Sequence, residues 1–181
     1  MHRPVLVVGI AAFAVVELVQ AFRSRRGARP ADLRAEAVFR VLFLAGILML
    51  PLGRALAPDA VFGPFALGAV VMWAGLLLRW WSFRTLGRFF TVVVKTSADQ
   101  PVVDRGPYRV LRHPSYTGLL LICAGVGVML GNWVGAAASF LLVLGALIYR
   151  LRIEERALSA ALGERYRAYA AGRARLVPYV Y

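Results

Sequence analysis

Long apolar runs alternate with short polar segments along most of the chain. The first three runs cover residues 4–22, 37–56 and 60–83. A helix rises about 1.5 Å per residue, so about 20 apolar residues cross a hydrocarbon core of about 30 Å. Each run is therefore long enough for a transmembrane helix. Only residues 57–59 separate the second run from the third, and so short a link predicts antiparallel neighbours.

The last apolar stretch, 116–149, is too long for one ordinary span and carries Gly131-Asn132-Trp133 near its middle. This interruption predicts a tight helical hairpin. Two helices of about 15 residues each are short for the bilayer, so we expect thinning of the membrane, incomplete crossing or help from flanking residues. Six glycines would let these helices pack closely: Gly118, Gly125, Gly127, Gly131, Gly135 and Gly145.

These patterns predict an all-α polytopic membrane protein with five transmembrane helices. The last two form the hairpin, and a cytoplasmic carboxy-terminal helix follows them. We expect a single membrane-embedded domain over 1–181, in which 1–84 supply the amino-terminal spans. A cleaved signal peptide is the alternative for the first run, but the positive charges follow this run rather than precede it.

Composition and charge agree with this prediction. The 181 residues are 60% hydrophobic and 17% charged, with 22 Lys and Arg against 9 Asp and Glu. Of these 22 basic residues, 20 lie in segments 23–40, 79–115 and 150–181, which five spans place on one side of the membrane. The positive-inside rule makes that side cytoplasmic and puts the amino terminus outside, in a multi-pass protein of the cell membrane. Separate basic blocks do not form a nucleic-acid-binding face, so we expect no nucleic acid partner.

Few side chains suit a metal site or a nucleophile. The one cysteine, Cys123, lies in an apolar stretch, which favours a small buried hydrophobe over a reactive thiolate. His2 and His113 are too few for a metal site of their own. We therefore expect no metal.

The segment 105–118 is the first polar interruption that topology does not require. Its Gly106-Pro107 pair predicts a turn, and Pro114 fits the first turn of the following helix. His113 or Ser115 would then lie beside free amides at a helix amino terminus, where anions and carboxylates bind. A basic turn anchored among lipid headgroups explains the same residues equally well.

The segment 150–155 is the second such interruption. Arg150 and Glu154 share one helical face, which also fits a surface ion pair where a helix leaves the membrane. Both polar segments lie at the cytoplasmic ends of the predicted hairpin. For that reason we expect His113 and Glu154 to converge on one pocket.

Several linked motifs in the carboxy-terminal half resemble the isoprenylcysteine carboxyl methyltransferase family. They are Gly106-Pro-Tyr-x-x-x-Arg-His-Pro-Ser-Tyr-x-Gly118, Arg150-x-x-x-Glu-Glu, Leu162-Gly-Glu-x-Tyr-x-x-Tyr and Leu176-Val-Pro-Tyr. The similarity covers roughly residues 85–181, whereas the first helices resemble the family only as membrane spans. The small size and the preference for Ala, Gly and Arg over Lys indicate a bacterial member.

This resemblance implies an integral-membrane methyltransferase that uses S-adenosylmethionine and takes a lipidic acceptor from the bilayer. By the resemblance, residues 85–181 are the cofactor-binding half, and Arg150 and Glu154 are the catalytic pair, with Arg150 binding the carboxylate of an isoprenylcysteine-like acceptor. The implied cofactor-binding residues are Gln100, Pro101, Val102, Val103, Tyr108, His113, Pro114, Ser115, Tyr116 and Glu154. Lys95 is a further candidate.

The chemistry of methyl transfer is compatible with these residues. An in-line displacement needs alignment and exclusion of water rather than a nucleophilic side chain. A carboxylate is ionised near pH 7 and needs only a cation to position it. An amine acceptor, as in a phospholipid or amino-lipid N-methyltransferase, would need Glu154 or Glu155 as a base. A non-catalytic membrane assembly or transport protein is a third hypothesis, but only Glu17 and Gln20 interrupt a span.

Overall fold

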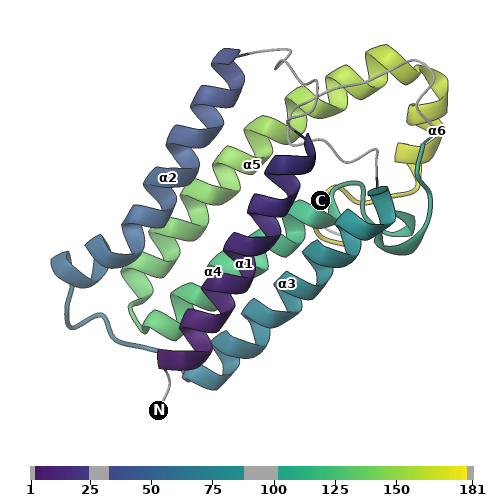
Figure 1. Ribbon diagram of the computed structural model, residues 1–181. Coiled ribbons are helices and arrows are strands. Elements are labelled where there is room, and N and C mark those ends of the chain that lie inside the picture. Colours follow the sequence, from purple (N-terminus) through teal and green to yellow (C-terminus); the bar gives the residue numbers. More distant parts are fainter. Residues whose placement is uncertain (1–2, 25–32, 88–101, 179–181) are drawn as a thin grey trace.

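The described residues form a bundle of helices (Figure 1). The computed structural model describes residues 3–24, 33–87 and 102–178. Their elements are α1 (Arg3–Ser24), α2 (Leu33–Leu56), α3 (Phe65–Leu86), the 3-10 helix η2 (Gly106–Arg109), α4 (Pro114–Leu130), α5 (Trp133–Leu162) and α6 (Glu164–Ala171). The β pairing in these ranges is limited to two isolated bridges. The predicted all-α class is confirmed.

The apolar helices have the character of a membrane protein. Within the described residues, three helical segments are long and apolar enough to span a bilayer, namely Glu36–Leu56, Phe65–Leu86 and Trp133–Leu162. Two further apolar helical segments, Pro4–Val19 and Pro114–Leu130, are shorter. Many large apolar side chains of α1 and α2 face outward, as lipid-facing residues do. The multi-pass class is thus supported, and the count of five spans stays a prediction.

The predicted hairpin between α4 and α5 is confirmed. Gly131 ends α4 in the left-handed conformation (φ 70°), which glycine adopts without steric penalty. Asn132 caps α5, because its Oδ1 accepts a hydrogen bond from the amide of Gly135 at 2.8 Å. The other polar atom of the Asn132 side chain is also bonded, because Nδ2 donates to the carbonyl of Ala57 at 2.7 Å.

The predicted helix lengths were wrong for the second arm of the hairpin. α4 has 17 residues, whereas α5 has 30 and continues through the polar segment that follows Arg150. No proline or glycine lies between Arg150 and Gly163, where a positive φ of 57° ends the helix. The change from apolar to charged residues shows where the surroundings of the helix become polar. It does not show where the helix ends.

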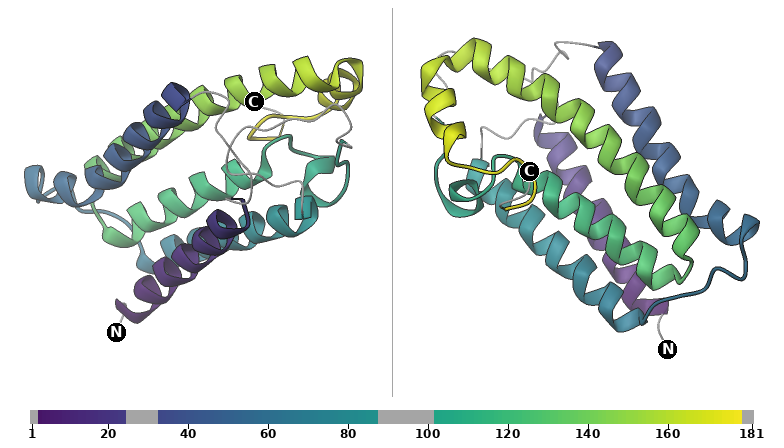
Figure 2. Two further views of the ribbon diagram at one scale, coloured as in Figure 1. Left: turned by 45° about the horizontal axis from the view of Figure 1, so that its top comes forward. Right: turned by 180° about the vertical axis from the view of Figure 1, so that it is seen from behind.

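α2 and α3 are not the packed neighbours that their short link predicted. α2 packs mainly against α5, and α3 packs mainly against α4 (Figure 2). The connection runs over 57–64 and crosses the α4–α5 turn, where the amide of Phe62 donates to Gly131 and that of Trp133 donates to Ala60. The link therefore carries the chain across the hairpin instead of reversing it beside α2.

Glycines bring α3 and α4 into close backbone contact. A Cβ on Gly75 would lie 2.6 Å from the carbonyl oxygen of Gly118, and a Cβ on Gly68 would lie 2.7 Å from that of Gly125. The reverse contacts are equally short, at 2.8 and 2.6 Å. The close packing expected from Gly118 and Gly125 is confirmed. The prediction of close packing is wrong for Gly145, where a Cβ would meet nothing within 4 Å.

α5 forms the centre of the core. Its Val143, Leu147 and Leu151 are completely buried. It packs against α2 on one side and α4 on the other, so that it joins the α2–α5 pair to the α3–α4 pair. α1 lies against α3 on the outer side of the bundle (Figure 2).

One charged pair is built into this packing. Arg79 of α3 is 7% exposed and donates from Nε to Glu17 of α1 at 2.6 Å. Its Nη1 donates to the carbonyl of Ser115 at the start of α4, at 2.8 Å. Arg79 is one of the 20 basic residues that the sequence assigns to one side of the membrane, and it follows Met72 and Leu76 along the buried face of α3.

Candidate active site

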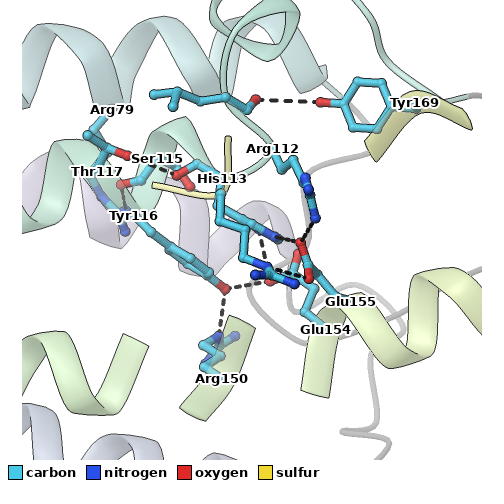
Figure 3. Close-up of polar contacts among 12 residues, drawn as sticks. Arg79, Arg112, His113, Ser115, Tyr116, Thr117, Arg150, Glu154, Glu155 and Tyr169 are labelled. Carbon is cyan, nitrogen blue, oxygen red and sulfur yellow. Dashed lines mark hydrogen bonds and ion pairs between the residues drawn. The ribbon is translucent and has the colours of Figure 1, made fainter. Parts of the chain in front are cut away.

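The candidate site lies at one end of the bundle, where η2, the start of α4, the second half of α5, α6 and residues 173–178 meet (Figure 1). Gly106, with φ 56°, and Pro107 form the predicted turn at the start of η2. Pro114 begins α4 as predicted. His113 is the N-cap residue, but its side chain makes no capping hydrogen bond and points into the site instead (Figure 3).

The carboxy-terminal segment holds the approach to α4. The amide of Arg112 donates to the carbonyl of Ala174 at 2.8 Å, and that of His113 donates to Arg175 at 3.1 Å. Thr117 Oγ1 then donates to the carbonyl of Leu176 at 2.6 Å. These bonds fix the backbone on both sides of His113. Sequence reasoning missed this contact, for which the Leu176-Val-Pro motif was the available signal.

The hydroxyl of Tyr116 joins α4 to α5. It donates to Glu154 Oε2 at 2.6 Å and accepts from Arg150 Nε at 3.0 Å (Figure 3). The ring of His113 stacks on that of Tyr116, with centroids 5.5 Å apart and planes 7° apart. His113 Nδ1 lies 3.9 Å from Glu154 Oε2. The expected convergence of His113 and Glu154 is confirmed.

Arg150 of α5 is a buried cation with partners on α2 and α4. It is 8% exposed, and its Nη1 donates to Glu36 Oε2 of α2 at 2.9 Å. Its guanidinium also lies over the ring of Phe39, 4.5 Å from the centroid. Glu36 is bonded in turn by Arg40 Nε at 3.0 Å. The sequence analysis missed Glu36, although an acidic residue in the first turn of a membrane helix is unusual enough to serve as a signal.

Glu155 has a different set of partners from Glu154. Arg112 Nη1 and Arg175 Nε each donate to its carboxylate at 2.9 Å. His113 Nε2 lies 3.4 Å from Glu155 Oε1, but it makes no hydrogen bond. Glu155 therefore ties together the loop before α4 and the carboxy-terminal segment. The side chain of Glu154 is 30% exposed and that of Glu155 is 14% exposed, so Glu154 is the more accessible carboxylate.

Three tyrosines close the site from η2 and α6. The hydroxyl of Tyr169 donates to the carbonyl of Tyr108 at 2.9 Å and so fastens α6 to η2. Burial raises the pKa of Tyr108 well above its ordinary value, and the nearby Glu154 carboxylate raises it further. Burial, together with the charges of Glu155 and Glu154, also raises the pKa of Tyr166. Both phenols are therefore protonated at neutral pH and lie near the two carboxylates.

Two buried polar atoms of the site have no hydrogen-bond partner in the described part of the chain. They are His113 Nε2 and Tyr166 Oη, on side chains whose residues are 6% and 5% exposed. Buried polar groups are almost always satisfied, so an unsatisfied pair beside carboxylates indicates a place for a polar ligand.

The other predicted site residues have less specific surroundings. Pro114 and Ser115 are buried at the start of α4. Val102 and Val103 are half-buried just before η2. Gln100, Pro101 and Lys95 lie outside the described residues. In the described ranges no group of three or more His, Cys, Asp or Glu side chains could hold a metal ion.

Comparison with known proteins places the site in a wider context. The phospholipid methyltransferase family matches residues 64–165, which is more than half of the chain. The chain is 36% identical over 115 residues to protein-S-isoprenylcysteine O-methyltransferase A of Arabidopsis thaliana, covering 62% of the chain and 58% of that protein. It is 30% identical over 112 residues to the Schizosaccharomyces pombe protein-S-isoprenylcysteine O-methyltransferase, covering 61% of the chain and 47% of that protein. The chain thus spans about half the length of these curated relatives.

A solved structure shares the fold. It is that of the eukaryotic intramembrane Ras methyltransferase, isoprenylcysteine carboxyl methyltransferase, determined without a monobody. The TM-score is 0.68 at 19% sequence identity, and the match covers 99% of this chain and 68% of that chain. At 19% sequence identity, the match shows a shared arrangement of the helices.

Proposed function

The chain belongs to the phospholipid methyltransferase family, and on this basis we propose that it transfers the methyl group of S-adenosylmethionine to the carboxylate of a lipidic, isoprenylcysteine-like acceptor. Its similarity to the Arabidopsis and fission yeast proteins supports the choice of acceptor. The observation that carries the proposal is the Tyr116 hydroxyl, which connects Arg150, the proposed acceptor residue, directly to Glu154, the proposed cofactor residue.

The side chains near Glu154 suit S-adenosylmethionine. The unsatisfied His113 Nε2 and Tyr166 Oη can bond a hydroxylated sugar or an amino acid group, and the Glu154 carboxylate can accept from a hydroxyl or an ammonium. The rings of Tyr108, His113 and Tyr116 offer apolar faces to a purine. When bound, the cofactor supplies an electrophilic methyl group on a sulfonium. Gln100, Pro101, Val102, Val103, Pro114 and Ser115 complete the proposed binding set.

Arg150 would orient the acceptor. A carboxylate is already anionic at pH 7, so no side chain has to remove a proton from it. A guanidinium held in place by Tyr116 and by the ring of Phe39 has few ways to turn, which favours a fixed approach of the bound carboxylate. The low exposure of Arg150 also keeps water from the reacting oxygen.

An amino-lipid N-methyltransferase is the second candidate, because the matching family is described as phospholipid methyltransferase. That reaction requires a base for the ammonium proton. Glu155 already accepts from two arginines, and Glu154 accepts from Tyr116. Both carboxylates are therefore already engaged as hydrogen-bond acceptors, whereas methylation of a carboxylate needs no base, which favours the carboxylate acceptor.

We also propose a multi-pass orientation in the cell membrane with the site on the cytoplasmic side. The 20 basic residues on one side of the predicted topology support it. A purely structural or transport role is less well supported, since Glu17 is paired with Arg79.

Methyl transfer from radiolabelled S-adenosylmethionine to N-acetyl-S-farnesylcysteine by the detergent-solubilised protein tests the proposal. We expect a labelled product that mild alkali hydrolyses, as it does an ester. With an amino-lipid such as phosphatidylethanolamine supplied instead, a labelled product that resists alkali would identify an amine acceptor. The absence of both transfer and cofactor binding in calorimetry would disprove the methyltransferase assignment.

A further inference from the structure

The ion pair between Arg150 and Glu36 lies inside the protein, although it joins residues 114 positions apart. The Nη1–Oε2 distance is 2.9 Å, and the two side chains are 9% and 12% exposed. A charge-assisted bond shielded from water is strong, and a buried charge whose partner is removed is costly. Arg150 therefore has a carboxylate partner before any acceptor arrives.

The surroundings of Arg150 restrict where a second carboxylate could bind. Tyr116 Oη accepts from Nε, and the ring of Phe39 covers one face of the guanidinium. Glu36 bonds Nη1. An incoming carboxylate that uses the same guanidinium meets Glu36 as its direct competitor.

Glu36 has a second partner at the surface. Its other oxygen accepts from Arg40 Nε at 3.0 Å, and the side chain of Arg40 is 66% exposed. Once displaced from Arg150, the Glu36 carboxylate remains paired with Arg40 and close to water. Its release is thus much less costly than the exposure of an unpaired buried charge.

From this geometry we infer that Glu36 is a positioning and specificity residue that holds Arg150 between turnovers and exchanges with the acceptor carboxylate. The inference rests on the proposed function, because it takes Arg150 as the acceptor residue. Exchange of one carboxylate for another keeps the buried cation neutralised throughout.

The exchange also distinguishes substrate from product. Esterification joins the methyl carbon to a carboxylate oxygen, and the electron pair of the broken carbon–sulfur bond stays on sulfur, so that no proton moves. The acceptor loses its negative charge in this step. A neutral ester cannot compensate Arg150, whereas Glu36 can. Glu36 therefore returns to the guanidinium and promotes release of the ester.

The variant Glu36→Gln tests the exchange by binding rather than by turnover. We expect calorimetry in detergent to show about tenfold lower Kd values for N-acetyl-S-farnesylcysteine and for its methyl ester, the factor expected if the Glu36–Arg150 ion pair is open in one molecule in ten. Glu36→Asp weakens the pair without removing the charge, so it should lower both Kd values by a smaller factor. Glu164→Gln removes an equal charge from an exposed pair with Arg167 and should change neither value.

A merely structural role predicts a different result. If Glu36 only neutralised Arg150, Glu36→Gln would lower the Kd for the anionic acid alone, because an uncompensated buried cation attracts an anion; an unchanged Kd for the neutral ester would therefore overturn the inference. If Glu36→Gln does not fold, Glu36→Asp decides by the same criterion. Failure of the proposed function would look different, because wild-type protein would then bind the acid without producing labelled ester.

Discussion

The hydrogen-bond partners of Tyr116, Glu154 and Glu155 divide the candidate site into two parts. Tyr116 Oη lies between Arg150 and Glu154, so one atom contacts both the proposed acceptor residue and the proposed cofactor residue. Glu155, next in sequence, is instead bonded by Arg112 and Arg175. Adjacent carboxylates on one helix point about 100° apart, which explains why their partners differ.

Charge removal at the two proposed catalytic residues should have separable effects. Glu154→Gln should weaken cofactor binding about tenfold or more, because a bond to a charged group is worth about 1.5–3 kcal/mol. Arg150→Gln should reduce kcat/KM for the acceptor by a similar factor while cofactor affinity falls less. Calorimetry with S-adenosylmethionine and steady-state kinetics measure the two quantities. Equal losses of both quantities in both variants would contradict the separate roles.

At this scale the sequence predicted the residues that lie in motifs, and it missed their distant partners. His113, Tyr116, Arg150 and Glu154 were recognised, and the structure brings them together. The partner Glu36 lies outside every motif, in the first turn of a membrane helix. Sequence spacing reports which residues share a helix face, but it does not report which helix faces them.

Helices meet closely where glycines oppose one another. Gly68 and Gly75 of α3 face Gly125 and Gly118 of α4, so that backbone atoms touch where side chains would otherwise separate the helices. This contact sets the direction of α4, and it thereby places the residues of its first turn relative to α3.

Gly125→Ala should destabilise the protein by about 1–3 kcal/mol, because the new Cβ would lie 2.6 Å from the carbonyl oxygen of Gly68 and neither backbone can move freely. Gly145→Ala is the matched control on α5, since a Cβ there meets nothing within 4 Å. Thermal unfolding in detergent should show a lower Tm for the first variant only. An unchanged Tm for Gly125→Ala would show that the two helices can separate at little cost.

α6 depends on a tyrosine that resists ionisation. Burial raises the pKa of Tyr169 to about 12. In the unfolded chain Tyr169 ionises near pH 10. The folded state therefore gains stability from the protonated tyrosine below pH 10, and this contribution is lost as the pH rises toward 12. The fall in Tm between pH 9 and about 11 should therefore be smaller in Tyr169→Phe than in the wild type. An identical fall in both proteins would show that Tyr169 titrates as in the unfolded chain.

Elements were predictable where local chemistry determines them. The α4–α5 turn follows from Gly131 and Asn132, and the start of α4 follows from Pro114. Helix partners were not predictable, because the link at 57–64 turns across the hairpin through backbone bonds that no side-chain pattern records. The extent of α5 was missed because charged residues were taken as the end of a helix that in fact continues to Leu162.

The whole molecule combines an apolar bundle with a polar end. The exposed apolar side chains of α1 and α2 suit a lipid environment, whereas the ion pairs Arg150–Glu36 and Arg112–Glu155 lie at the end of the bundle where α2 and α4 begin. This arrangement would let the proposed lipidic acceptor keep its chain in the bilayer while its carboxylate reaches Arg150.

The orientation of the molecule can be tested with introduced cysteines. In a Cys123→Ala background, Asp59→Cys should react with a membrane-impermeant maleimide added to intact cells, because the positive-inside rule places residues 57–59 outside. Arg165→Cys on α6 should react only after lysis. Both positions are exposed, so access rather than burial determines labelling. The reverse pattern would place the site on the outer face.

The bridging position of the Tyr116 hydroxyl has a thermodynamic consequence. Whatever binds at Glu154 changes the hydrogen bond that Arg150 makes, and whatever binds at Arg150 changes the one that Glu154 accepts. The two ligands therefore share a coupling free energy, and linkage makes it reciprocal: the factor by which the cofactor alters acceptor affinity equals the factor by which the acceptor alters cofactor affinity. Tyr116→Phe should bring that factor close to one and leave the two binding steps independent.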